Sequence, residues 1–102
     1  MQAHDDDRVI ETWQVRVHGR VQGIGYREAC MSRTRALALG GWVRNRSDGS
    51  VELMLQGPVA SLTRMREWLR DGVPLARVDA LDVSPVARAC PRYEQFERLP
   101  TL

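Results

Sequence analysis

The stretch His18-Gly19-Arg20-Val21-Gln22-Gly23-Ile24-Gly25-Tyr26-Arg27 decides how the rest of this chain is arranged. It holds three glycines and lies between an alternating, strand-like run and a run with helical spacing. Glycine lets the backbone adopt positive φ and come close to a ligand. A glycine-rich turn that opens a helix also aims unpaired N–H groups and the positive end of the helix dipole at one point. The stretch therefore predicts a cradle for an anion such as phosphate.

Arg27 supports this interpretation, because it falls in the first turn of the expected helix. A positive charge there opposes the helix dipole and costs about 0.3–1 kcal/mol, unless a bound anion reverses the local field. Arginine also holds a tetrahedral oxyanion with two parallel hydrogen bonds. From the turn alone, an ordinary strand-to-helix connection with an exposed arginine is an equal alternative. Nucleotide loops do not match, because Glu28 breaks the dinucleotide fingerprint and the chain has no lysine for a Walker loop.

The composition is that of one folded domain of 102 residues, with 43% hydrophobic and 27% charged residues. We expect a flexible acidic tail over residues 1–8 and a single domain over 9–102. The net charge of +2 comes from 15 arginines scattered among the acids, which suits a local positive pocket better than a long nucleic-acid footprint.

Location and cysteine chemistry follow from what the sequence lacks. It shows no secretory signal and no transmembrane run. Cys30 and Cys90 are too few and too isolated for a disulfide framework or a zinc site. We therefore expect a cytoplasmic protein, with Cys30 packed on the inner face of the first helix.

Hydrophobic periodicity predicts five strands and two helices. Asp48-Gly49 marks a hairpin, and a second helix lies between Gly57-Pro58 and Asp71-Gly72. The first helix covers about 25–39, and the strands cover about 10–17, 42–45, 50–56, 77–83 and, less regularly, 93–99. This order predicts an α+β, ferredoxin-like split βαβ sandwich (βαββαβ), an antiparallel sheet with two helices on one face.

The side chains that the sequence lacks limit the reactions that this chain could catalyse. His4 and His18 are isolated, so no cluster has metal-ligand spacing and we expect no metal. No serine or cysteine has a recognisable base and orienter, so water must attack directly. Direct attack without an acid suits a carboxylate leaving group, whose parent acid has a pKa near ~4. An acyl phosphate is such a substrate.

A direct mechanism also needs a group that orients water. Asn45 lies where the second strand reaches its hairpin, and its amide can hold a water molecule without taking its proton. An asparagine at this position is also typical of a turn that is closed by a side-chain-to-backbone hydrogen bond. Taken alone, the residues favour the second interpretation.

Two long motifs carry a resemblance to a known family. The first runs from Gly19 to Arg27, and the second joins Gly41-Trp42-Val43-Arg44-Asn45 to Asp48-Gly49-Ser50-Val51-Glu52. Together, and at this separation, they resemble the acylphosphatase family closely. The resemblance extends from about Thr12 to Phe96.

The resemblance implies a ferredoxin-like enzyme that hydrolyses the carboxyl-phosphate bond of acyl phosphates without metal or cofactor. Arg27 matches the family's phosphate-binding arginine, and Asn45 matches its water-positioning asparagine. The backbone of the cradle matches over Val21, Gln22, Gly23, Ile24, Gly25 and Tyr26. We expect a monomer that binds an acyl phosphate, with inorganic phosphate or sulfate as competing anions, and that has no nucleic-acid or membrane partner.

Three positions depart from the family pattern. Tyr26 stands where phenylalanine is usual, and its hydroxyl needs a partner. Ala38 replaces a glycine often found at the end of the first helix, so Gly40 is expected to end it. Arg98 replaces an apolar residue, which puts a regular final strand in doubt.

Two other functions stay open at this point. A non-catalytic module that binds acyl phosphate or carbamoyl phosphate would show no turnover. An RNA-binding domain can share this topology, but fold analogy is weak evidence and the third strand has Leu53, Met54 and Leu55 where stacking aromatic residues would be needed.

We expect hydrolysis of benzoyl phosphate to persist in excess EDTA, because the sequence shows no metal-ligand cluster. Phosphate monoesters should be poor substrates, since their alkoxide leaving groups need protonation or a metal. The measurement is loss of the anhydride with and without chelator. Activity abolished by EDTA and restored by a divalent metal would contradict the prediction.

Overall fold

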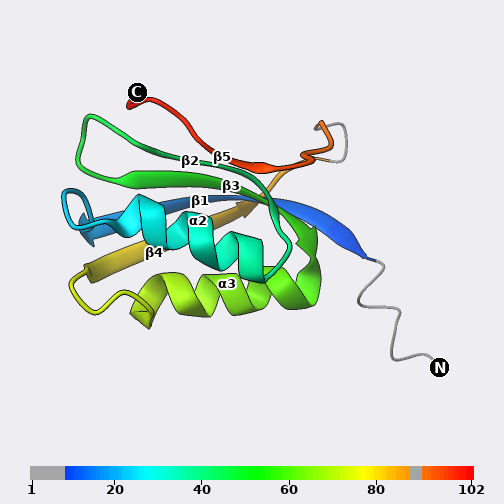
Figure 1. Cartoon of the computed structure of the whole chain (residues 1–102), viewed down its shortest axis with the longest axis horizontal. Coiled ribbons are helices and arrows are strands. Elements are labelled where there is room, and N and C mark those ends of the chain that lie inside the picture. The colour runs from blue at the N-terminus through cyan, green and yellow to red at the C-terminus, as the bar shows by residue number, and fades with distance from the viewer. Residues whose placement is uncertain (1–8, 88–90) are drawn as a thin grey trace.

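The computed structural model describes residues 9–87 and 91–102. The predicted acidic tail (1–8) and Cys90 lie outside this part of the chain. Element labels follow Figure 1. In chain order the elements are β1 (Ile10–Arg20), α2 (Tyr26–Ala36), β2 (Gly40–Asn45), β3 (Val51–Pro58), α3 (Val59–Asp71), β4 (Arg77–Pro85) and β5 (Phe96–Arg98). The predicted βαββαβ order is confirmed, and the last strand predicted over about 93–99 is present as β5 but covers only three residues.

The strands form one sheet in the order β4-β1-β3-β2-β5. β1 pairs antiparallel with β3 and β4, and β2 pairs antiparallel with β3. The prediction of an antiparallel sheet is wrong at one edge, where β5 runs parallel to β2. The reason is topological. β4 finishes at the end of the sheet where β2 begins, so the next strand starts there and runs in the same direction as β2.

Both helices lie on one face of the sheet, as predicted (Figure 1). Alternation puts one side of each strand against them, and the helices present an apolar stripe in return. The core between the layers includes Val15, Val17, Val43, Val51, Leu53 and Leu55 from the sheet and Tyr26, Cys30, Leu62, Met65 and Leu69 from the helices. Neither helix is long and apolar enough to span a membrane, within the part of the chain that the structure describes.

Cys30 faces the core as predicted, and Tyr26 of the same helix does so too. Cys30 is fully buried among the core residues, and this burial raises the pKa of its thiol above the ordinary value. Tyr26 is also buried, and its hydroxyl donates a hydrogen bond of 2.7 Å to the carbonyl of Leu69 in α3. The partner that this hydroxyl needs is therefore a backbone group, and the bond joins the start of α2 to the end of α3.

The end of α2 differs from the prediction. The helix stops at Ala36 rather than near residue 39. Gly40 does not end it, because Gly40 is already the first residue of β2. Ala38 itself takes the left-handed conformation that usually follows a helix, with φ of 56°. The next N–H, that of Leu39, then reaches back to the carbonyl of Thr34 at 2.9 Å.

We expect Ala38→Gly to raise the free energy of unfolding by roughly 0.5–1 kcal/mol. A left-handed alanine costs about 1–2 kcal/mol, which exceeds the ~0.4–1 kcal/mol by which glycine favours the unfolded chain. Urea denaturation measures the change. Ala36→Gly is the matched control, because Ala36 is the last residue of α2. This substitution should lower the free energy of unfolding by about 0.5–1 kcal/mol. Equal losses in both variants would mean that Ala38 is not strained.

Candidate active site

The glycine-rich stretch forms the turn between β1 and α2. Gly23 and Gly25 have φ of 80° and 81°, and the space beside them is open where a Cβ atom would lie. Gly25 is the N-cap residue of α2, and no side chain caps this helix end. The first N–H groups of a helix have no intrahelical partner. The turn therefore offers backbone donors at the positive end of α2, which is the geometry expected of an anion cradle.

A small pocket of about 80 Å³ lies against this turn. It brings together two predicted site residues from different elements, Arg27 of α2 and Asn45 of β2. The side chain of Ile24 packs against the core instead. The other residues that line the pocket are Val21, Gln22, Gly23, Gly25, Tyr26, Glu28 and Arg98.

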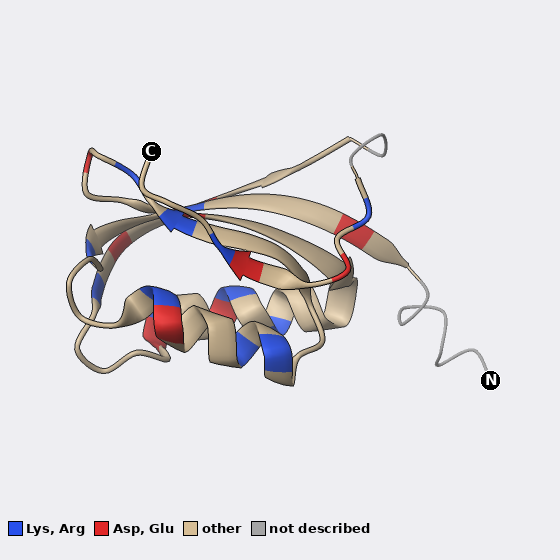
Figure 2. Ribbon diagram, turned by 45° about the horizontal axis from the view of Figure 1, so that its top comes forward, with Lys and Arg blue, Asp and Glu red and all other residues tan. Residues whose placement is uncertain are grey.

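The positive charge of this pocket is local. Basic and acidic positions are interspersed along both helices and the strands (Figure 2). Carboxylates pair with five other arginines of the described residues, namely Arg16, Arg44, Arg46, Arg77 and Arg98. Arg27 takes no part in these ion pairs. Arg27 lines the pocket in the first turn of α2, where its charge opposes the helix dipole and a bound anion would offset the cost.

Asn45 is the last residue of β2 and is only 9% exposed. Its Oδ1 atom is buried and accepts no hydrogen bond from the described residues. The turn-closing bond that a hairpin asparagine could make is instead made by Asp48, whose Oδ1 accepts from the Ser50 N–H at 2.9 Å. An unsatisfied buried acceptor costs about 1–3 kcal/mol. The geometry therefore leaves Oδ1 of Asn45 able to accept a hydrogen bond from a ligand or water.

The side chain of Gln22 joins the cradle to the β2–β3 hairpin. Its Nε2 donates to the carbonyl of Arg46 at 2.8 Å and to the carbonyl of Ser50 at 2.9 Å. The same two residues close the hairpin, since the Arg46 N–H donates to the Ser50 carbonyl at 2.9 Å. Gln22 thus fixes the position of the turn relative to Asn45, while its backbone remains part of the cradle.

Glu52 anchors the arginines on either side of Asn45. Its carboxylate is almost fully buried and accepts hydrogen bonds from Gln14 at 2.6 Å, Arg46 at 2.9 Å and Arg44 at 3.0 Å. Burial alone would raise the pKa of Glu52. The hydrogen bonds from Arg46, Arg44 and Gln14 outweigh it, so the pKa lies below the ordinary value. This network keeps both guanidinium groups on the outer face of β3.

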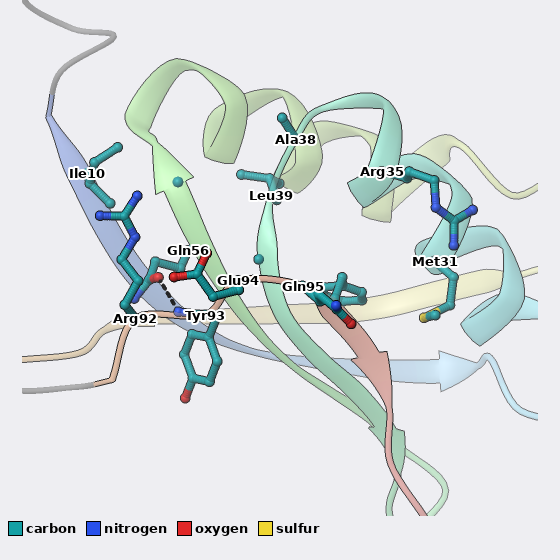
Figure 3. Close-up of a pocket in the computed structure, with 13 residues that line it drawn as sticks. Ile10, Met31, Arg35, Ala38, Leu39, Gln56, Arg92, Tyr93, Glu94 and Gln95 are labelled. Carbon is teal, nitrogen blue, oxygen red and sulfur yellow. Dashed lines mark hydrogen bonds between the residues drawn. The ribbon is translucent and has the colours of Figure 1, made fainter.

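A larger hollow of about 550 Å³ lies at the opposite end of the sheet (Figure 3). It is bounded by the end of α2, the start of β2 and residues 92–96. Its central amide, Gln56, accepts a hydrogen bond of 2.8 Å from the Tyr93 N–H and donates one of 2.9 Å to the Pro91 carbonyl. Neither Arg27 nor Asn45 lines it, so the size of a cavity does not mark the predicted site.

Sequence reasoning missed two charged residues of the small pocket. Arg98 of β5 donates to Glu28 in the first turn of α2, with Nη1 and Oε2 2.5 Å apart. Arg98 stood out in the sequence only as a departure from an apolar pattern. Its place beside Arg27 depends on the parallel pairing of β5 with β2, which places Arg98 opposite Val43.

Comparisons with known proteins agree with one another. A family model described as Acylphosphatase matches residues 13–98. An acylphosphatase of Polaromonas naphthalenivorans is 54% identical over 98 residues, which are 96% of this chain and 97% of the relative. Acylphosphatase 1 of Ralstonia nicotianae is 55% identical over 97 residues, 95% of either chain. The crystal structure of acylphosphatase from Bacillus subtilis superposes with a TM-score of 0.83 at 31% identity, over 89% of this chain and 99% of that chain.

The lowered pKa of Glu52 predicts an acid-sensitive fold. Between the folded and unfolded pKa values the unfolded chain binds more protons, so the stabilisation is complete above the ordinary pKa of a glutamate and is lost as pH falls through the lower pKa of the folded state. We expect Glu52→Gln to lower the free energy of unfolding by about 2 kcal/mol or more at pH 7. The stability of this variant should also depend less on pH than that of the original chain. Denaturant titrations from pH 3 to 7 measure both effects.

The exposed acid Glu67 on α3 provides the matched control, as Glu67→Gln should leave the pH dependence unchanged. If Glu52→Gln keeps the full acid sensitivity of the original chain, then other carboxylates carry the effect. Asp48 is the first of these to test, because hydrogen bonds from the Ser50 side chain and backbone lower its pKa as well.

Proposed function

This chain belongs to the acylphosphatase family and is a hydrolase of acyl phosphates, and we propose that Arg27, Asn45 and the backbone of the β1–α2 turn carry out the reaction. The observation that carries the proposal is the buried, unpartnered Oδ1 atom of Asn45 on the pocket that Arg27 also lines. One group can hold an attacking water and the other can hold the phosphoryl group. Both occur where an anion cradle opens onto the same space.

The cradle and Arg27 bind the phosphoryl group. Backbone N–H groups between Val21 and Tyr26 donate to its oxygens, and the Arg27 guanidinium adds two parallel, charge-assisted hydrogen bonds. Arg27 forms no ion pair with a carboxylate among the described residues, and the phosphoryl group of the substrate supplies its anionic partner. Because the donors are fixed by the turn, the site needs little reorganisation when negative charge shifts in the transition state.

Asn45 positions the nucleophile. Its Oδ1 atom accepts a hydrogen bond from a water molecule and holds the water oxygen in line with the bond to be broken. The water oxygen forms a bond to phosphorus as the bond from phosphorus to the acyl oxygen breaks. The bond electrons leave on the carboxylate, which needs no proton at neutral pH because its parent acid has a pKa near ~4. The products are a carboxylate and inorganic phosphate.

This mechanism requires no group outside one chain. The backbone donors, Arg27 and Asn45 all come from β1, α2, β2 and the turn between the first two. We therefore propose that a monomer is sufficient for activity and that inorganic phosphate and sulfate, as tetrahedral anions, compete with the substrate. We also propose a cytoplasmic location, which is consistent with the free, buried thiol of Cys30.

We expect Asn45→Ala to lower kcat by at least ~10²-fold, or roughly 2.7 kcal/mol, as for the loss of one preorganised polar group at a reacting centre. Phosphate should still inhibit, because the cradle and Arg27 are unchanged. Steady-state hydrolysis of benzoyl phosphate, with inorganic phosphate as inhibitor, measures both quantities. A folded Asn45→Ala variant with near-normal kcat would show that another group holds the water.

Arg27→Ala should fail differently, because the guanidinium acts on both bound phosphate and the transition state. We expect turnover and phosphate inhibition to fall together, and Arg27→Lys to fail as well, since an ammonium cannot reproduce the planar two-bond contact. Arg35→Ala is the matched control: it removes the same charge from an exposed position near the end of the same helix. Phosphate inhibition that survives in Arg27→Ala would place the anion site elsewhere.

A further inference from the structure

The last strand delivers a second arginine to the phosphate pocket. Phe96 packs against the core, so Arg98, two residues later on β5, projects from the same face of the sheet, toward α2. There Arg98 lines the pocket together with Arg27 and Asn45. The backbone at this point is fixed, because the Leu99 N–H donates to the carbonyl of Val43 at 2.9 Å.

In the structure, Arg98 forms a weak ion pair with Glu28. Its side chain is 45% exposed, and that of Glu28, to which it donates, is 67% exposed. Exposed ion pairs contribute little to stability, because water screens both charges. Glu28 is also stabilised independently of Arg98, because an acidic residue in the first turn of a helix interacts favourably with the helix dipole. Separating Arg98 from Glu28 therefore costs little free energy.

A bound phosphoryl group changes the balance at this pair. Glu28 lines the same pocket of about 80 Å³, so its carboxylate would face a second anion at short range. The phosphoryl oxygens offer Arg98 a more highly charged acceptor than one carboxylate does. Arg27 on α2 and Arg98 on β5 approach the pocket from different elements, so one phosphoryl group can accept hydrogen bonds from both.

We propose that Arg98 is a second substrate-binding residue of this enzyme, which exchanges Glu28 for the phosphoryl group when an acyl phosphate enters. The proposal rests on the proposed function of the cradle and extends it. Arg98 binds the phosphoryl group in the ground state and the transition state alike. Its loss is therefore expected to appear in KM and in phosphate affinity rather than in kcat.

A simpler role must be distinguished from this one. Arg98 could lower the repulsion between Glu28 and substrate merely by neutralising the carboxylate, without touching the phosphoryl group. The two roles differ once Glu28 is uncharged. If Arg98 only masks the carboxylate, its removal has no effect in a Glu28→Gln background; if it binds the anion, its removal still weakens binding there.

The experiment measures inorganic phosphate binding by titration calorimetry at constant ionic strength in Arg98→Gln, Glu28→Gln and the double variant. We expect Arg98→Gln to weaken phosphate binding about fivefold or more, and Glu28→Gln to strengthen it about twofold or more, as charge-assisted contacts at a partly exposed site suggest. The double variant should bind about fivefold or more weakly than Glu28→Gln. The KM for benzoyl phosphate should follow these changes, with kcat of Arg98→Gln within about twofold of the original.

Arg92→Gln is the matched control, because it removes the same charge from the C-terminal segment at the opposite end of the sheet. The proposal is overturned if Arg98→Gln binds phosphate normally, if Arg92→Gln weakens binding equally, or if the double variant binds as tightly as Glu28→Gln. Failure of the cradle itself would look different, since Arg27→Ala would then bind phosphate normally. Because calorimetry does not need turnover, the two failures are separable.

Discussion

The two hydrogen bonds from the side chain of Gln22 to the carbonyls of Arg46 and Ser50 hold the two halves of the site in one place. Arg27 and the cradle follow β1, whereas Asn45 ends β2, and β3 lies between these strands in the sheet. Strand pairing fixes where each strand ends within the sheet. It does not fix the position of a turn that lies beyond the last pair of bonded residues. Gln22 fixes this position by attaching the turn to the closing residues of the hairpin. In the proposed mechanism, the spacing between the phosphoryl group and the attacking water therefore depends on this side chain.

The positions of the glycine-rich turn, Arg27 and Asn45 could be predicted from the sequence because each belongs to a contiguous motif with local causes: positive φ at glycine, the start of a helix, the end of a strand. Their roles in binding and attack stay predictions. The features that sequence reasoning missed depend on contacts between distant parts of the chain. The pairing of β5 with β2, and with it the place of Arg98, follows from where β4 ends. The left-handed Ala38 was missed for another reason, since backbone conformation there is imposed by the return of the chain to β2 rather than by the residue's own preference.

The distribution of charge pairs several arginines near the site with protein carboxylates. Glu52 holds Arg44 and Arg46 on the outer face of the sheet, where the buried carboxylate satisfies both guanidinium groups. Arg16 pairs with the hairpin residue Asp48. These contacts direct the neighbouring positive charges toward protein carboxylates and away from the pocket. Arg27 remains outside the ion pairs of the described residues, so its charge is available to a ligand.

The site lies where folding leaves polar groups without hydrogen-bond partners, so residues elsewhere in the protein must supply the stability that the site lacks. The buried Oδ1 of Asn45 and the uncapped first turn of α2 both oppose folding, by about 1–3 kcal/mol for a buried acceptor alone. The apolar layer between sheet and helices compensates through residues that touch no part of the pocket, such as Leu53, Leu62 and Met65. A substitution that supplied Oδ1 of Asn45 with a hydrogen-bond donor from within the protein would stabilise the fold. In the proposed mechanism the same donor would occupy the position of the attacking water, so stability and turnover would be opposed at this residue.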